Sequence, residues 1–252
     1  RFETRVEDIY SLTPLQDGML FHNIANEKSM GYVNQNVFSI RGDVEEKTIK
    51  QALKLLALRH DVLRTAIMYE KLFKPRQVML HDREIGYERT DLSGLDELEQ
   101  EKKIADITDC HIQRGFNLQQ EPLLRIHYIA LGNDSHKLIW NYHHIILDGW
   151  CMSILYGDFN RFYGMLKNGR SLPDLARMVA EEKKQTASYG EYIQWMEKQD
   201  RDLGLSYWED LLADYEETVE IKPVMQPEST DQQVKREIVQ LSTVTSKTLI
   251  QT

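Results

Sequence analysis

The sequence has few cysteines, no excess of basic residues and no long apolar run. Two of its 252 residues are cysteines, Cys110 and Cys151, so a disulfide framework is excluded and a reducing, cytoplasmic compartment is expected. Its 31 basic residues are outnumbered by 40 acidic ones, and the net charge of −9 argues against a nucleic-acid partner. No apolar run approaches the roughly 20 residues of a membrane span, so we expect no membrane partner.

Several common site motifs are also missing. The sequence contains no G-x-S-x-G elbow, no P-loop and no G-x-G-x-x-G fingerprint. Its eight histidines show no ligand spacing, so we expect no metal. Residues 1–5 lack the apolar core of a signal peptide and begin without Met, and we therefore expect the chain to be a piece of a longer protein.

What is present is an ordinary globular composition, 41% hydrophobic and 28% charged, in which strand and helix patterns alternate. This alternation predicts an α/β fold, an α+β two-layer sandwich with a mixed sheet flanked by helices. Thr13 suits the N-cap of the first helix, and Asp43 with Glu46 suits a capping box at the second. The predicted helices are residues 14–25, 43–60, 95–114, 150–167, 189–212 and one starting at 244, and the predicted strands are 32–40, 63–69, 76–80, 85–89, 123–131, 137–143 and 234–241.

The most informative stretch is residues 143–149, HHIILDG, where a strand ends and a helix begins. By strand alternation His143 and His144 point to opposite faces, so they are expected to do different jobs. A histidine beside apolar walls can stay neutral near pH 7 and accept a proton from a nucleophile. Packing with a backbone hydrogen bond is the alternative for the pair. Asp148 is either an orienting carboxylate or a structural ion-pair partner, and Gly149 allows a turn.

Two further features near this stretch have more than one interpretation. Residues 59–65, RHDVLRT, close a predicted helix, and their two arginines suit either a helix C-terminus or, for one of them, burial against Asp148. Cys151 follows His144 by seven residues at a helix start, which can lower a thiol pKa. A packing role for this thiol is nevertheless simpler than a Cys–His nucleophile.

Taken together, the motifs resemble those of condensation domains of nonribosomal peptide synthetases. Residues 10–22, 59–65 and 143–149 resemble three successive motifs of that family, the last being its HHxxxDG motif, which Trp150 continues. Residues 116–125 and 189–208 resemble further family stretches. Small departures occur at Asp17, Asn117 and Cys151, where the family commonly has Glu, Asp and Ser. The resemblance covers nearly the whole chain but only about the first half of the family's domain.

The resemblance implies a chloramphenicol acetyltransferase-like fold of two lobes. Residues 1–170 would form the N-terminal lobe with HHxxxDG, residues 171–188 a linker, and residues 189–252 the truncated start of the second lobe. The active site would lie between the lobes, so the activity of the isolated fragment is left open by the sequence.

The resemblance also implies an activity and partners. His144 would act in the attack of an acceptor aminoacyl amine on a donor thioester, while His143 would be structural. Asp148 would pair with Arg64, with Arg59 nearby, and Gly149 would leave space at the reacting centre. The implied partners are upstream and downstream peptidyl carrier proteins and a neighbouring adenylation domain. The carriers supply 4′-phosphopantetheine, and this domain itself would bind no cofactor.

Other functions remain open at this stage. Epimerisation domains and stand-alone acyltransferases share the HHxxxDG motif. A catalytically silent domain that docks carrier proteins is a third possibility, although intact His144, Asp148 and Gly149 argue against it.

Overall fold

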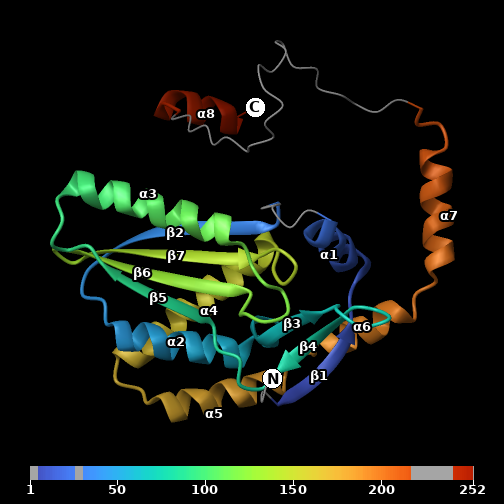
Figure 1. Cartoon of the computed structure of the whole chain (residues 1–252), viewed down its shortest axis with the longest axis horizontal. Helices are drawn as coiled ribbons and strands as arrows, with labels where there is room; N and C mark the ends of the chain where they lie inside the picture. Colours follow the sequence, from blue (N-terminus) through green and yellow to red (C-terminus); the bar gives the residue numbers. More distant parts are fainter. Residues whose placement is uncertain (1–4, 26–30, 217–240, 252) are drawn as a thin grey trace. The chain divides into compact units, whose positions relative to one another are not determined.

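The structure, a computed structural model, describes residues 5–25, 31–216 and 241–251, which fall into two compact units. The first unit, residues 1–199, contains both sheets (Figure 1). The second, residues 200–252, contributes helices α7 (Arg201–Leu212) and α8 (Thr243–Gln251). We describe each unit by itself, and the candidate site lies in the first.

The larger sheet of the first unit has four strands in the order β2-β7-β6-β5. The pairs β2–β7 and β6–β7 are antiparallel, whereas β5 runs parallel to β6. A parallel neighbour requires a crossover connection, and helix α3 provides it. The bounds are β2 (Val33–Arg41), β5 (Gly86–Asp91), β6 (Leu124–Gly132), β7 (Ser135–His143) and α3 (Glu97–Arg114).

Helices cover both faces of this sheet, and alternation along β7 shows how (Figure 1). On one face Trp140 packs edge-on against Tyr156 and Phe159 of α4 (Gly149–Lys167), in the main core that also includes α2 (Glu46–Arg59). On the other face Ile139 joins a small cluster with partly buried residues of α3. Because both faces are buried, the middle of β7 is the continuous apolar run Leu138, Ile139 and Trp140.

The smaller sheet has three strands, in the order β1-β4-β3, all antiparallel. A 3-10 helix, η1 (Asp61–Arg64), leads into it from α2. Helix α1 (Pro14–Ala25) follows β1 and begins as predicted with Thr13 as its cap: Thr13 Oγ1 accepts from the N–H of Gln16, and Gln16 Oε1 accepts from the N–H of Thr13. The strands are β1 (Val6–Ser11), β3 (Thr65–Met68) and β4 (Arg76–Leu80).

Residues 171–188, interpreted from the sequence as a linker in which some helix was allowed, contain a packed helix. Helix α5 (Leu172–Lys183) lies along α2 and buries Leu175 and Val179. The polar run that suggested a linker is the solvent-facing side of this helix, and its two buried residues are spaced i, i+4. The two compact units divide between residues 199 and 200.

Several predicted boundaries also shift. The single helix expected over residues 189–212 is broken into α6 (Tyr189–Glu197) and α7, because Asp200 caps a new helix through the N–H groups of Asp202 and Leu203. The Asp43 cap is wrong, since α2 begins after Glu45. Strand β1 was not predicted, and the predicted strand 234–241 lies almost wholly outside the described residues. None of the described helices is long and apolar enough to cross a membrane.

Candidate active site

The HHxxxDG stretch connects the last strand of the larger sheet to helix α4. Strand β7 ends at His143, residues 145–147 form a buried turn, and Asp148 precedes the first residue of α4. Burial of Ile145, Ile146 and Leu147 anchors this turn in the main core, so the polar residues on either side of it are held in place.

His143 is fully inside the protein. It is 1% exposed and lies between the rings of Tyr32 and Phe116. Burial, and to a lesser extent the neighbouring His144, lowers the pKa of His143 to about 4, so its ring is neutral at pH 7. Its Nδ1 accepts a hydrogen bond from the N–H of Ile145 at 3.1 Å. His143 therefore fixes the turn and has no access to a substrate.

His144 differs from His143 in its exposure and in its hydrogen bonds. Its side chain is partly exposed, and its backbone N–H donates to the carbonyl of Tyr32 at 2.8 Å. The ring Nδ1 is buried and has no hydrogen-bond partner within the described part of the chain. Nε2 is thus the ring nitrogen that a reacting group can reach. The backbone of His144 is held in place by Tyr32, the residue that precedes β2.

Asp148 serves as the N-cap of helix α4. Its Oδ1 accepts from the N–H of Cys151 at 2.8 Å, and hydrogen bonds from the Cys151 thiol and N–H lower the pKa of this exposed carboxyl. Burial, followed by the bond to Asp148, raises the pKa of the Cys151 thiol, which is the opposite of what a thiolate nucleophile needs. Apart from the neighbouring backbone of its own helix, no described residue lies within 4 Å of the place where a Cβ on Gly149 would sit, and Trp150 is 86% exposed.

The expected pairing of Asp148 with Arg64 is wrong. Arg64 is 5% exposed, and its ion pairs are with Glu7 at 2.8 Å and Asp61 at 2.6 Å. It also donates to the carbonyl oxygens of Ala57 and Leu80. Arg64 therefore joins β1, η1 and α2 to β4, and Asp148 is satisfied locally as a cap.

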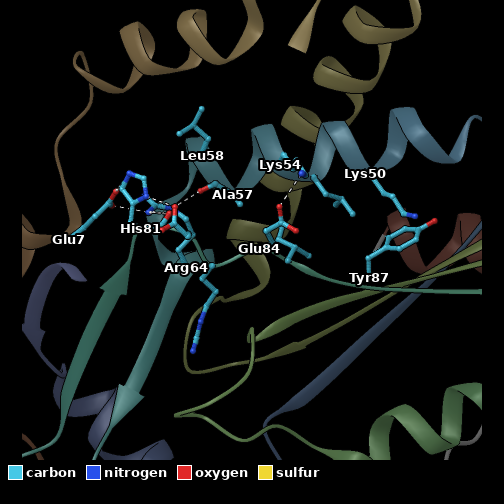
Figure 2. Close-up of a pocket in the computed structure, with 13 residues that line it drawn as sticks. Glu7, Lys50, Lys54, Ala57, Leu58, Arg64, His81, Glu84 and Tyr87 are labelled. Atoms are coloured by element: carbon cyan, nitrogen blue, oxygen red, sulfur yellow. Dashed lines mark hydrogen bonds and ion pairs between the residues drawn. The ribbon is translucent and has the colours of Figure 1, made fainter. Parts of the chain in front are cut away.

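Arg64 lines a pocket of about 610 Å³ between α2 and the strands (Figure 2). Figure 2 shows Glu7 and His81 gathered around Arg64 at one end, the Lys54–Glu84 ion pair in the middle, and Lys50 with Tyr87 at the other end. None of residues 143–149 lines this pocket. The polar residues that line this pocket thus support the packing of α2 on the strands and are not part of the HHxxxDG site.

Arg59 also lies away from the HHxxxDG residues. Its Nε is 3.9 Å from a carboxylate oxygen of Glu182 on α5. Arg161 of α4 forms a two-point contact with the same carboxylate, at 2.9 Å to each oxygen. Arg59 consequently helps to hold α5 against α2 and α4. The predicted site residues therefore fall into two groups: those in or next to the HHxxxDG stretch, and the two arginines, Arg59 and Arg64, which stabilise the packing of the surrounding helices and strands.

Gln16 belongs to the candidate site although its role was not foreseen. Its side-chain amide donates to the carbonyl oxygen of Ile145 at 2.9 Å and also contacts Gln77, which in turn donates to the carbonyl of Ser11. The sequence places Gln16 in a family-like motif, but no local pattern shows that its partner lies 129 residues away.

A family model described as Condensation domain matches residues 6–252. The chain belongs to the condensation-domain family. It is 35% identical over 217 residues to bacitracin synthase 1 of Bacillus licheniformis, which covers 86% of this chain and 4% of that protein. It is also 35% identical over 213 residues to tyrocidine synthase 2 of Brevibacillus parabrevis, covering 84% of this chain and 6% of that protein.

Solved condensation domains share the fold. The first condensation domain of the calcium-dependent antibiotic synthetase, in complex with a substrate analogue, superposes with a TM-score of 0.63 at 22% identity, over 84% of this chain and 49% of that one. The starter condensation domain of rhizomide synthetase gives 0.58 at 20% identity, over 66% and 40%. These matches confirm the expected chloramphenicol acetyltransferase-like α/β fold. This condensation-domain chain spans about half of the first of these solved domains and a few per cent of the synthetases.

Proposed function

We propose that this chain carries the catalytic histidine of a domain that forms peptide bonds in nonribosomal peptide synthesis. The amine of an acceptor aminoacyl thioester attacks the carbonyl carbon of a donor thioester. A C–N bond forms and the C–S bond breaks, so the chain moves to the acceptor and a thiol leaves. His144 accepts the proton that the amine loses and returns it to the departing sulfur.

The observation that supports this proposal most strongly is the contrast between the two histidines. His144 has a fixed backbone, a buried Nδ1 and a reachable Nε2. His143 is buried, with a lowered pKa and a structural hydrogen bond. One ring is therefore suited to exchange a proton with a bound reactant, and the other to support it. A positioned general base typically contributes about 10²–10⁴-fold to rate.

Gly149 and the start of α4 have a second role in this proposal. The open space where a Cβ would stand leaves room for the thioester to approach the helix N-terminus. The Asp148 carboxylate caps that terminus and keeps its first turn in register with the loop. These residues position the substrate, while the thioester itself supplies the driving force, so proximity accounts for much of the acceleration.

The partners we propose are two peptidyl carrier proteins, each presenting its aminoacyl group on a 4′-phosphopantetheine arm, and a neighbouring adenylation domain in the same cytoplasmic assembly line. The support is that the relatives are peptide synthetases many times longer than this chain, which covers 4% of bacitracin synthase 1. We also propose that residues 1–170 and 189–252 belong to two different lobes of the complete domain.

The test uses the complete parent domain with two loaded carrier proteins. Dipeptidyl-carrier formation is followed by intact-protein mass spectrometry for the wild type, His144→Ala and His81→Ala. His81 is a matched control because it is a partly exposed histidine outside residues 143–149. We expect product from the wild type and His81→Ala, and a loss of at least about 100-fold in His144→Ala.

Each other outcome has a defined meaning. Normal product from His144→Ala refutes the catalytic assignment. No product from the wild type, with proton exchange at the donor α-carbon, replaces condensation by epimerisation. Neither reaction, with carrier binding retained, indicates a docking domain.

A further inference from the structure

Three potential metal ligands that are far apart in the sequence meet at the edge of the larger sheet. They are Glu88 of β5, His111 of α3 and His127 of β6, and one donor atom from each lies within 4.8 Å of the others. Both histidines are 6% exposed, whereas the Glu88 side chain is 41% exposed. The cluster is thus buried on the side of the imidazoles and open on the side of the carboxylate.

The donor atoms form a triangle of suitable size. His111 Nε2 lies 2.7 Å from His127 Nδ1, and Glu88 Oε2 lies 3.7 Å and 3.8 Å from these two nitrogens. The point equidistant from all three atoms is about 2.0 Å from each, which matches the lengths of Zn–N and Zn–O bonds, roughly 2.0–2.2 Å. An ion at or just above this point would need only small movements of the side chains.

The protonation states also fit. The second nitrogen of His127, Nε2, lies 2.8 Å from the Thr90 hydroxyl, and a proton on Nε2 leaves the Nδ1 lone pair directed at the cluster. Burial is the main cause that lowers the pKa of both histidines. In the ion-free protein one N–H bridges the two rings. On metal binding this proton moves from Nε2 to Nδ1 of His111, which is buried and has no hydrogen-bond partner among the described residues.

The charged groups around the cluster limit and direct binding. Arg114 donates to Oε1 of Glu88 at 2.9 Å, which leaves Oε2 for an ion. Arg125 donates to the carbonyl of His111, and its charge weakens the attraction of a cation. Neutral imidazoles therefore have to supply most of the affinity, which favours a borderline-soft ion such as Zn²⁺ over Ca²⁺ or Mg²⁺. Water reaches the fourth position from the exposed side of Glu88.

We propose that Glu88, His111 and His127 bind one Zn²⁺ ion, with water as the fourth ligand. The ion links α3 to β5 and β6 and so fixes the crossover helix on the sheet. This site is separate from residues 143–149 and does not depend on the function proposed for His144.

The test measures Zn²⁺ binding to the tag-free chain by titration calorimetry and by metal analysis after dialysis. Glu88→Gln keeps the size of a half-exposed side chain, and Thr90→Val removes only the partner of His127, so both variants should fold. His81→Gln is the matched control, because the His81 side chain also lies beside a carboxylate but is itself 46% exposed. Co²⁺ serves as a second probe, because four-coordinate Co²⁺ with nitrogen ligands has visible absorption bands.

We expect one Zn²⁺ per wild-type chain and per His81→Gln chain, and at least about tenfold weaker binding in Glu88→Gln and Thr90→Val. The Co²⁺ spectrum should weaken in the same two variants. No stoichiometric Zn²⁺ in the wild type overturns the proposal. Equal binding by the wild type and Glu88→Gln, or a loss in His81→Gln equal to that in Glu88→Gln, overturns it as well.

Discussion

The side-chain amide of Gln16 donates a hydrogen bond to the carbonyl oxygen of Ile145 at 2.9 Å. Through this bond helix α1 holds the turn that separates His144 from Asp148. Both groups are buried, so neither can turn to water if the bond is lost. The geometry of the HHxxxDG turn thus depends on a residue near the start of the chain.

Replacing Gln16 should therefore affect both stability and activity. Gln16→Leu leaves the Ile145 carbonyl and the Thr13 N–H without partners, and we expect a loss of about 2 kcal/mol in the free energy of unfolding, measured with urea. Peptide formation by the complete parent domain should fall at least about tenfold, because small misplacements of a catalytic group are costly. Asp17→Leu, next to it and exposed, should stay within about 0.5 kcal/mol. Equal effects of the two changes would contradict the role of the bond.

Two cations that line the same pocket should differ sharply in their contribution to stability. Arg64→Met leaves Glu7 and two carbonyl oxygens without their guanidinium partner around a buried position, while Asp61 keeps its ion pair with Lys183, and we expect about 3–5 kcal/mol of destabilisation in urea. Lys54→Met breaks an exposed ion pair with Glu84 and should cost no more than about 1 kcal/mol. A small effect at Arg64 would show that its network is not structurally required.

The cap at Asp148 can be separated from its charge. Asp148→Ala removes the acceptor for the Cys151 N–H and should lower the free energy of unfolding by about 1 kcal/mol. Asp148→Asn retains an acceptor of the same shape and should be within a few tenths of a kcal/mol of the wild type. If Asn is as destabilising as Ala in urea denaturation, then the negative charge matters and the capping explanation fails.

His143 should make the stability of the protein depend on pH. Its pKa in the folded protein is about 4, below the ordinary 6.5, so the unfolded chain takes up a proton first as the pH falls. Protonation therefore favours the unfolded chain as the pH falls. The contribution of His143 to the free energy of unfolding decreases from about pH 6.5 downward, and the decrease is complete below about pH 4. From pH 7 to pH 4.5 this one group should account for about 2 kcal/mol.

The variant His143→Asn isolates that contribution, since its side-chain oxygen can accept from the N–H of Ile145 in place of Nδ1. His60, His111 and His127 also have a lowered pKa, mainly through burial, and they steepen the fall in both proteins alike. Urea denaturation at the two pH values should show a smaller loss in the variant. The same loss in both proteins would mean that His143 does not titrate in this range.

Local periodicity predicts much of the fold. Strand β4 falls at the predicted residues, and α4 begins one residue before its predicted start, because both have strong local patterns and clear ends. Strand β1 was missed because Glu7 and Asp8 interrupt its apolar character, and only its pairing with β4 makes it a strand. The extent of helix α5 was not predicted, because its two buried residues were outweighed by a charged run.

In the candidate site, too, features set by neighbouring residues were predictable, and features set by distant residues were not. The position of the HHxxxDG motif between a strand and a helix was predictable, since it is encoded within a few residues. The partners of Arg64 were not, because Glu7 lies 57 residues before it. The cluster of Glu88, His111 and His127 was hidden for the same reason, since its members lie on three different elements.

The pairing of β2 with β7 has a consequence for synthesis on the ribosome. Val33 pairs with His143 and Arg41 with Ser135, so β2 cannot find its partner until roughly 100 more residues have been made. At about 5–20 residues per second this delay is about 5–20 s. During that time β2 is an unpaired strand of low charge without proline, and its amide side chains can form ladders, so it is a segment prone to pair with another nascent chain. Those amide side chains are Asn34, Gln35 and Asn36.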